Sequence, residues 1–375
     1  MSGPQPTSYR SFFLLFLCLC FFLSCKKNET ISGSAQGAGS CYFPPVGRTE
    51  WATTSPQSLG WNTANIQPLY DFLASQQTRA FLVLKDGKIV LEKYFGQAIG
   101  GTAAFNQNSQ WYWASAGKTL TSFVVGKAQQ EGFLSINRPT SQYLGVGWTA
   151  APSAKEGLIT VRHQLTMTTG LDDATGDASN TAPAALLYKA DAGTRWAYHN
   201  APYTLLQKVV ANATGQTFSH YFETKLKARI GMDGQWVANG NDNVYWSTPR
   251  SMARFGLLIL NKGKWETEEV LNDATYFTAM VNTSQDLNLS YGYLWWLNGK
   301  PSAMVPQSGI VYPGPLCANG PADMFSAMGK NGQLLSIVPS KGLVVVRMGD
   351  NANNTLVPIQ FQNNLWEKLK AVINP

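Results

Sequence analysis

Ser115 and Lys118 stand three residues apart in the segment Ser-Ala-Gly-Lys, a spacing that places two side chains on one face of a helix. A serine hydroxyl is a weak nucleophile near neutral pH and needs a base within hydrogen-bonding reach. Lysine becomes that base when burial and a nearby cation lower its pKa from about 10.4 by several units. At a helix start, Ser115 also gains from free backbone N–H groups and from the helix dipole. The pair therefore predicts nucleophilic catalysis on a carbonyl group.

Histidine is scarce in the chain, which disfavours a Ser-His-Asp triad. The three histidines are His163, His199 and His220, and no Gly-x-Ser-x-Gly segment occurs. We expect all three to be structural. The Ser-x-x-Lys pattern alone has little specificity, because Ser24 and Lys27 match it in an N-terminal segment unsuited to catalysis. The segments around and after Ser115 therefore decide whether its match to the pattern is meaningful.

Four segments carry a family pattern in order along the chain. They are 111–121 around the serine, 165–171 (Leu-Thr-Met-Thr-Thr-Gly-Leu), 193–200 (Gly-Thr-Arg-Trp-Ala-Tyr-His-Asn) and 329–333 (Gly-Lys-Asn-Gly-Gln). Together they resemble the serine β-lactamase and penicillin-binding-protein superfamily. The likeness is to its class C-like branch, which includes esterases, D-amino-acid peptidases and 6-aminohexanoate-dimer hydrolases. The resemblance runs from about residue 60 to the C-terminus and implies a serine hydrolase.

The resemblance implies a role for each matching residue of the first two motifs. Ser115 matches the serine that becomes acylated, and Lys118 matches its base. Tyr198 and Asn200 match the Tyr-x-Asn motif. In that role Tyr198 relays a proton to the leaving group or acts as a phenolate base, and Asn200 orients Lys118 or a substrate amide.

The third motif departs from the family pattern. Lys330-Asn331-Gly332 matches the Lys-Thr-Gly or His-x-Gly strand motif, and Lys330 is the candidate cation beside the catalytic lysine. The resemblance assigns one oxyanion donor to the backbone N–H of Gln333 and the other to that of Ser115. Asn331 stands where Thr or Ser usually helps to hold a penicillin-type carboxylate. We therefore expect inefficient β-lactam hydrolysis.

Local patterns predict which elements position these residues. Two β-rich runs flank Asp86-Gly87, which indicates a hairpin. The expected helices are 116–131, 159–168, 201–212, 250–261 and 353–373, and the expected further strands are 291–297, 333–338 and 342–348. This order predicts an α/β (α+β) fold of the β-lactamase/transpeptidase-like kind. An antiparallel sheet from both chain ends (60–110 and 290–375) is expected to flank a helical part at 111–289.

The N-terminus reads as an export signal. Arg10 precedes the apolar run 12–23, which is shorter than the roughly 20 residues of a membrane span but suits a signal peptide. Ser24-Cys25 then resembles a bacterial lipoprotein cleavage box, although Phe22 stands where Leu is usual. We expect residues 1–24 to be removed and Cys25 to carry a lipid that anchors an exported protein to the membrane. A plain secretory signal and an uncleaved anchor are the alternatives.

The segment after Cys25 is expected to be a tether. Residues 25–59 begin with a Gly- and Ser-rich stretch typical of flexible linkers, and residues 60–375 form the expected hydrolase domain. Besides the lipidated Cys25, the mature chain is expected to keep Cys41 and Cys317. An oxidising compartment favours a disulfide between them, and two free buried thiols are the alternative.

Composition narrows the partners. The hydrophobic fraction of 44% and charged fraction of 14% are typical of a globular protein, and the formal charge of +7 is scattered without a long basic run. We therefore expect no nucleic acid partner, no cofactor and no metal. We also expect a monomer. Its substrate is expected to be a small ester, a short amide or D-amino-acid peptide, or a cell-wall (peptidoglycan) fragment. The alternatives are a non-catalytic penicillin-binding sensor on the same fold and an acyltransferase.

Overall fold

The computed structural model of the protein describes Met1, Gly3 and residues 41–174, 176–350 and 356–373. Residues Ser40–Pro375 form one compact unit. The expected signal peptide, Cys25 and the first part of the expected linker lie outside the described residues. No helix in the described ranges combines the length and apolar character that crossing a membrane requires.

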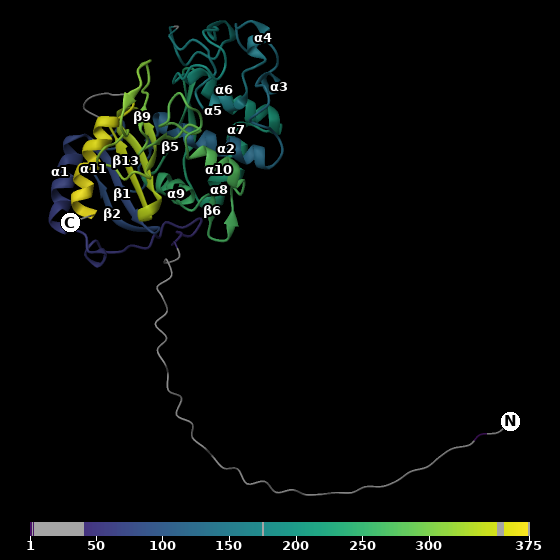
Figure 1. Cartoon of the computed structure of the whole chain (residues 1–375). Helices are drawn as coiled ribbons and strands as arrows, with labels where there is room; N and C mark the ends of the chain where they lie inside the picture. Colours follow the sequence, from purple (N-terminus) through teal and green to yellow (C-terminus); the bar gives the residue numbers. More distant parts are fainter. Residues whose placement is uncertain (2, 4–40, 175, 351–355, 374–375) are drawn as a thin grey trace. The chain divides into compact units, whose positions relative to one another are not determined.

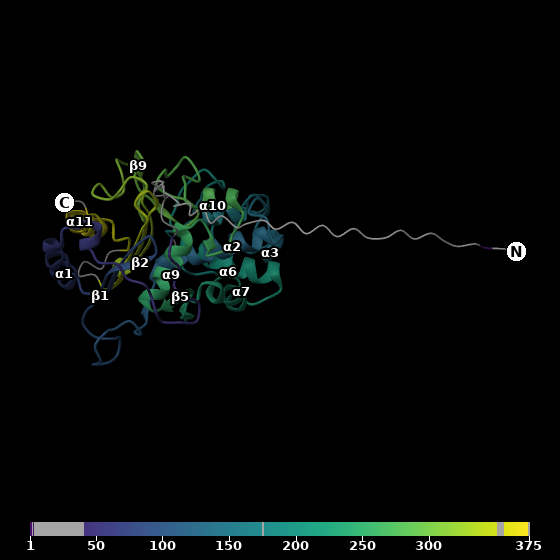
Figure 2. The same ribbon diagram turned by 90° about the horizontal axis from the view of Figure 1, so that it is seen from below.

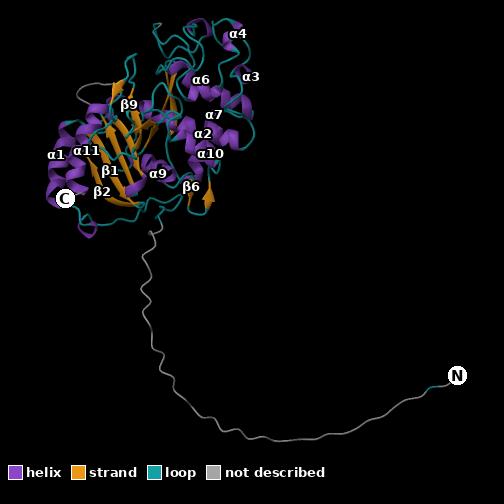
Figure 3. Ribbon diagram, in the orientation of Figure 1, coloured by secondary structure: helices purple, strands orange, loops and turns teal. Residues whose placement is uncertain are grey.

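A six-stranded antiparallel sheet lies at the centre of the unit (Figure 3). Its order is β2 (Lys88–Tyr94), β1 (Thr78–Lys85), β13 (Leu343–Gly349), β12 (Gln333–Val338), β11 (Phe325–Gly329) and β8 (Trp296–Leu297). Leu82 of β1 lies opposite Val346 of β13, so strands from both ends of the chain pair directly. The expected hairpin at Asp86-Gly87 joins β1 to β2, and the expected α+β fold is confirmed.

Helices cover both faces of this sheet (Figures 1 and 2). On one face, α1 (Ile66–Ser75) and α11 (Ile359–Ile373) pack on each other, and α11 buries an apolar stripe there. On the other face, α9 (Pro249–Leu260) contacts β1, β12 and β13. Its Gly256 permits this contact, because a Cβ there would lie 2.5 Å from a methyl carbon of Val344.

The chain between β2 and β8 forms a second part that holds most of the remaining helices. Its central helix α2 (Lys118–Gln130) is buried on nearly all sides. Of the other helices in this part, α6 (Asn200–Thr214) and α10 (Ala274–Met280) contact α2. The rest are α3 (Ser141–Leu144), α4 (Ser153–Glu156), α5 (Val161–Leu165), α7 (Phe218–Phe222) and α8 (Ala228–Ile230). The sequence did not predict a three-stranded sheet in this part, of β3 (Trp111–Tyr112), β5 (Asp242–Ser247) and β4 (Gln235–Asn239).

The other elements are short. The strand pairs are β6 (Lys264–Trp265) with β7 (Glu268–Glu269), and β9 (Ser302–Ala303) with β10 (Tyr312–Pro313). The 3₁₀ turns are η1 (Gln57–Leu59), η2 (Thr63–Asn65), η3 (Ala114–Gly117), η4 (Pro183–Ala185), η6 (Lys330–Gly332) and η7 (Pro339–Lys341), and η5 (Glu223–Lys227) is π-helical.

Two expected elements are shorter than predicted. The strand expected at 291–297 is reduced to β8, because Leu294 has φ +63° and a Cβ at Gly292 would lie 2.3 Å from a carbonyl oxygen. The helix expected from residue 353 begins at Ile359, directly after Pro358, a residue that suits the start of a helix and not its interior.

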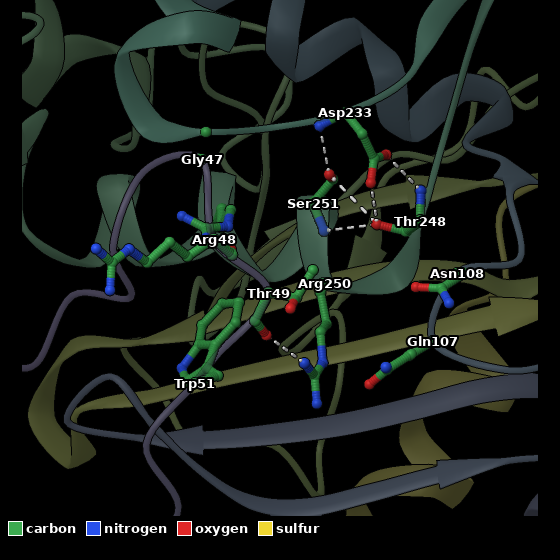
Figure 4. Close-up of a pocket in the computed structure, with 12 residues that line it drawn as sticks. Gly47, Arg48, Thr49, Trp51, Gln107, Asn108, Asp233, Thr248, Arg250 and Ser251 are labelled. Atoms are coloured by element: carbon green, nitrogen blue, oxygen red, sulfur yellow. Dashed lines mark hydrogen bonds between the residues drawn. The ribbon is translucent and has the colours of Figure 1, made fainter.

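Residues 41–59 pack against the domain and do not belong to a linker. Arg254 donates to three carbonyl oxygens of this segment at 3.0–3.2 Å (Pro44, Pro45, Arg48). Arg250 donates to the carbonyl oxygen of Thr49 at 2.9 Å beside a cavity of about 190 Å³ (Figure 4). The domain boundary expected at residue 60 therefore moves to Ser40, where the compact unit begins.

The disulfide expected between Cys41 and Cys317 is not formed. Both are free thiols, and each lies beside a different asparagine. Asn261, at the end of α9, donates to Cys41 Sγ at 3.3 Å, and Cys317 Sγ lies 3.8 Å from Asn363 Oδ1 on α11. The two cysteines therefore pack on helices that cover opposite faces of the main sheet.

Candidate active site

Ser115 is the second residue of η3, the 3₁₀ turn that leads into α2. Its backbone N–H has no acceptor within that turn, because the first N–H groups of a helix lack an intrahelical partner. Ala114, directly before it, has φ +46°. A left-handed conformation costs a residue other than glycine about 1–2 kcal/mol. Such strain persists only where surrounding structure holds it, as at a reactive site.

Lys118 lies beside Ser115 and is shielded from water. Its Nζ is 2.9 Å from Ser115 Oγ, and the residue is 3% exposed. Burial lowers the pKa of Lys118 to about 7, while the charge of Asp242 acts in the opposite direction. Burial therefore accounts for the lowered pKa, and the expected contribution of Lys330 is not needed, since that residue is exposed. Near neutral pH, Lys118 is about half neutral and able to accept a proton.

Two tyrosine rings from the region around the start of α6 enclose the lysine. Lys118 Nζ lies 5.0 Å from the ring centre of Tyr198 and 4.3 Å from that of Tyr203. Burial raises the pKa of Tyr198 above its usual value, and a hydrogen bond with Ser115 offsets part of that rise. Tyr198 therefore remains a phenol near neutral pH, which favours the proton-relay role over the phenolate role.

Tyr198 is held in place by other aromatic rings. Its ring stacks on Trp296 at 5.7 Å and meets Tyr291 edge-on at 6.3 Å. Trp196 contacts the same cluster at 6.4 Å. A cavity of about 730 Å³ opens beside Tyr198. Its lining combines apolar side chains (Trp196, Leu287, Met304, Val305, Val311) with polar ones (Asp173, Thr194, Arg195, Gln307, Ser308). It provides space for a bound group next to Tyr198.

The third motif forms a turn and not a strand. Lys330–Gly332 is η6, the connection between β11 and β12. The residue that approaches the serine is Gly329, at the end of β11: a Cβ there would lie 2.4 Å from the carbonyl oxygen of Trp113 and 3.0 Å from the backbone nitrogen of Ala116. Only glycine allows this close contact between the main sheet and η3.

Gln333 is displaced from the role that the resemblance assigned to it. It begins β12 and pairs with Gly329, so it lies one strand beyond the residue that touches η3. Its buried side chain donates from Nε2 to the carbonyl oxygen of Gly349 and accepts from that residue's backbone N–H. Gln333 therefore joins β12 to β13, and Gly329 at the end of β11 is the residue of this segment that contacts η3.

Asn331 stands at a position whose backbone explains the departure from Thr or Ser. Its φ of +64° is left-handed, a conformation that Asn tolerates and a β-branched residue does not. Its Nδ2 donates to the Tyr112 hydroxyl at 2.8 Å, so the amide is engaged within the protein. The guanidinium of the buried Arg347 is also engaged within the protein. It donates to the carbonyl oxygens of Asn331 and Gly332 and to other protein groups.

Asn200 leads to two residues that the sequence analysis missed. Its Nδ2 donates to Ser179 Oγ at 3.2 Å, and Ser179 Oγ donates to Asp242 Oδ2 at 3.0 Å. The charge of Asp242 acts on both Lys118 and Tyr198. No local pattern marks Ser179 or Asp242, because one lies in a loop and the other begins β5.

The remaining candidates are structural. His199 is 3% exposed, and burial lowers its pKa to about 4, so it stays neutral beside the site. His163 closes a capping box with Thr160 at the start of α5. Trp111 and Trp113 are core residues, and Trp113 Nε1 donates to Ser247 Oγ.

Comparisons with known proteins agree with this fold. The model of the Beta-lactamase family matches residues 73–355, and the chain belongs to that family. The D-alanyl-D-alanine-carboxypeptidase/endopeptidase AmpH of Escherichia coli is 27% identical over 207 residues, 51% of each protein, so the match spans about half of AmpH.

Solved structures share the architecture at low identity. A putative 6-aminohexanoate-dimer hydrolase from Bacillus anthracis superposes with a TM-score of 0.64 at 19% identity, over 85% of this chain and 87% of the other. A family VIII carboxylesterase gives 0.62 at 15% identity, over 84% and 99%. These two likenesses concern the fold, and the family as a whole supports a serine hydrolase.

Proposed function

We propose that this protein is a serine hydrolase that forms an acyl-enzyme on Ser115. The proposal rests on the position of Lys118. Its Nζ lies 2.9 Å from Ser115 Oγ, and the residue is only 3% exposed. A buried lysine with a pKa of about 7 is matched to taking a hydroxyl proton at neutral pH.

The reaction uses four kinds of protein group: the base Lys118, the nucleophile Ser115, backbone N–H donors and the proton donor Tyr198. Neutral Lys118 takes the hydroxyl proton as Ser115 Oγ attacks the carbonyl carbon of an ester or amide. The backbone N–H of Ser115 and a backbone N–H at the end of β11, where Gly329 contacts η3, stabilise the oxyanion, each contributing about 2.7–4 kcal/mol. Tyr198 passes its proton to the leaving group as that bond breaks, and Lys118 returns a proton to Tyr198. Water then attacks the acyl-enzyme and releases the acid.

A leaving group without a carboxylate suits the site best. Asn331 already donates to Tyr112, and Arg347 donates to backbone carbonyl oxygens, so neither is free to hold a penicillin-type carboxylate. The large cavity beside Tyr198 is lined by apolar and polar side chains, and its cation Arg195 is paired with Asp173. We therefore infer esters and uncharged amides as better substrates than β-lactams.

Covalent labelling of the purified full chain tests the proposal. A fluorophosphonate probe is expected to label the wild type and not Ser115→Ala, and p-nitrophenyl acetate hydrolysis is expected to disappear with the label. If the wild type neither reacts with the probe nor hydrolyses the ester, the hydrolase proposal is wrong. A stable adduct with a fluorescent penicillin and no turnover of any ester would support the sensor function instead.

We also propose that the protein is exported and anchored by a lipid on Cys25. The support is the apolar run 12–23 followed by Ser24-Cys25. Intact-mass measurement of protein from bacterial membranes tests it. A mature chain that begins at Cys25 with added acyl mass is expected, and an unmodified N-terminus would contradict the anchor.

A further inference from the structure

The ammonium form of Lys118 has few partners in the described part of the chain. Its Nζ lies 2.9 Å from Ser115 Oγ, and no other described residue forms a hydrogen bond or an ion pair with it. An ammonium carries three N–H donors. In the proposed reaction the proton of Ser115 moves to Nζ as Oγ bonds to the carbonyl carbon, so a positive charge forms at a residue that is 3% exposed. Most of that charge has to be stabilised without hydrogen bonds to the described residues.

The ring of Tyr203 lies against this charge. Nζ is over the ring at 4.3 Å from its centre, and Tyr203 is 6% exposed. In the described ranges this is the shortest contact between a cation and an aromatic ring, since the others measure 4.8–5.9 Å. The face of an aromatic ring is negative and attracts a cation, more strongly where water is excluded.

An exposed lysine of the same chain shows the contrast. Lys155 lies 5.8 Å from the centre of a tyrosine ring, but its side chain is 39% exposed and is ion-paired with Asp191. Water and a carboxylate stabilise that ammonium, so its ring contact contributes little. At Lys118 both are replaced by the ring.

Helix α6 holds the Tyr203 ring in place. Tyr203 is the fourth residue of α6, which packs on α2 near its start at Lys118 (Figure 1). Burial raises the pKa of Tyr203 above its usual value, so its phenol is neutral near pH 7. Tyr198, whose ring centre is 5.0 Å from Nζ, has the separate task of passing a proton to the leaving group. Tyr203 therefore acts on Lys118 as a neutral ring and not as an anion.

The other groups that face Lys118 carry little charge. Asp242 of β5 raises the pKa of Lys118 through its charge, without a hydrogen bond to it. Tyr291 lies edge-on to Tyr198, and burial raises its pKa well above the usual value, so it is neutral. Ser115 is the one residue of η3 with a polar side chain.

The remaining ionisable groups on and around α2 lie farther along the helix. Lys127 and Lys225 are ion-paired with Glu131, directly after the end of α2. Tyr276 of α10 donates to the carbonyl oxygen of Ser122. The ring of Tyr203 is therefore the group closest to the ammonium besides Ser115.

We propose that Tyr203 is a positioning residue whose ring face stabilises the ammonium form of Lys118 while its bulk keeps water away. This inference rests on the proposed hydrolase function and extends it to the tuning of the base. The two effects of the ring are opposed, because loss of water disfavours the ammonium and the negative ring face favours it. Together they let a buried lysine take the proton of Ser115 and hold it until the leaving group departs.

Fluorinated rings separate the two effects, because fluorine withdraws electrons from the ring face and hardly changes the shape of the ring. In the full chain, Tyr203→Phe is compared with replacement of Tyr203 by mono-, di- and trifluorinated phenylalanine. The measurement is the midpoint of the rising limb of kcat/KM against pH for p-nitrophenyl acetate. We expect Tyr203→Phe to stay within about 0.3 pH unit of the wild type, and the midpoint to fall with each fluorine to about one pH unit lower for the trifluorinated ring.

The same trifluorinated residue in place of Phe123 is the control. Phe123 is buried in α2, and its ring contacts that of Phe255 at 5.9 Å and no described cation. Its replacement should leave the midpoint at the wild-type value. A midpoint does not depend on how much of a preparation is active. The pH dependence of the rate of fluorophosphonate labelling gives the midpoint a second time, without ester turnover.

The outcomes separate the inference from the hydrolase function. A midpoint that is unchanged or rises along the fluorinated series would overturn the inference, leave Tyr203 as a packing residue and leave the hydrolase function intact. An equal fall after replacement of Phe123 would also overturn it, since fluorine would then act through the fold. If the wild type neither hydrolyses the ester nor reacts with the fluorophosphonate, the hydrolase function and the inference are both wrong.

Discussion

Lys118 and Arg347 are two buried cations with opposite surroundings. Arg347 is fully buried in β13, and each of its three guanidinium nitrogens donates to the protein. The acceptors are the Thr78 hydroxyl and the carbonyl oxygens of Gln76, Asn331, Gly332 and Asp350. Lys118 is almost as buried, but its hydrogen bond is to Ser115 and its other close neighbours are aromatic rings.

This difference fits a structural role for Arg347 and the proposed catalytic role of Lys118. Burial lowers the pKa of Arg347 to about 9 and that of Lys118 to about 7. The guanidinium therefore stays charged at neutral pH and joins β13 to the η6 turn. The ammonium has few partners that favour its charge, so it gives up its proton readily. Burial alone does not make a cation catalytic. The number of hydrogen-bond acceptors around the charged group decides how readily it gives up its proton.

The largest effect is expected at Ser115 and Lys118. Ser115→Ala and Lys118→Met should each lower kcat/KM for p-nitrophenyl acetate by at least about 10³-fold. Neither should lower the melting temperature, because neither residue supports the fold. Steady-state kinetics and thermal unfolding measure the two quantities. Lys127→Met, on the same helix, is the control, and activity of Lys118→Met within tenfold of the wild type would contradict the role of this lysine as base.

Arg347 should show the reverse pattern, with the effect on stability. Arg347→Met leaves several buried acceptors unpaired and should lower the free energy of unfolding by about 3–5 kcal/mol in urea titrations. Arg347→Lys should recover only part of this, since an ammonium does not match the planar set of acceptors. Arg79→Met, at a partly exposed residue, should cost at most about 1 kcal/mol. Equal stabilities for these three variants would remove the contrast.

The pH dependence sharpens the contrast. Because the neutral form of Lys118 is the base, kcat/KM should rise with pH and level off above the pKa of about 7. At pH 5 it should be about 100-fold below the plateau. The Asp242 carboxylate raises this pKa, so Asp242→Asn should move the rising limb to lower pH. A pH–rate profile that is flat from pH 5 to 8 would contradict Lys118 as base.

The smallest effect concerns the turn that Arg347 holds. Asn331→Thr places a β-branched residue at φ +64° and should cost about 1–2 kcal/mol of unfolding free energy. Glycine adopts this backbone conformation without strain, so Asn331→Gly loses only the hydrogen bond to Tyr112. It should lower the free energy of unfolding by less than about 1.5 kcal/mol. Chemical denaturation measures both. A Thr variant as stable as the Gly variant would show that the turn relaxes.

Local patterns predicted the parts of the fold that depend on neighbours in sequence. The hairpin at Asp86-Gly87 and the helix after Ser115 were found, because turn residues and helical periodicity act over a few positions. The strand expected at 291–297 was wrong, since contacts with distant backbone force its bend. The disulfide was wrong because cysteine counting carries no information on distance.

The candidate site divides in the same way. Lys118 and Tyr198 were predicted from motifs, and the structure brings both to Ser115. The oxyanion donor of the third motif was assigned to Gln333 on β12, which is one strand beyond Gly329 at the end of β11. Ser179 and Asp242 were missed, because they meet only when a loop and a separate small sheet pack together.

The sequence by itself placed the proposed nucleophile beside its proposed base, because residues three apart at a helix start meet wherever that helix lies. It also determined the fold class through the order of strands and helices. Only the tertiary structure decided the state of Lys118, since its lowered pKa comes from burial by rings distant in the chain. The orientation of Asn200 likewise depends on Ser179 and Asp242, which only folding brings to that side chain.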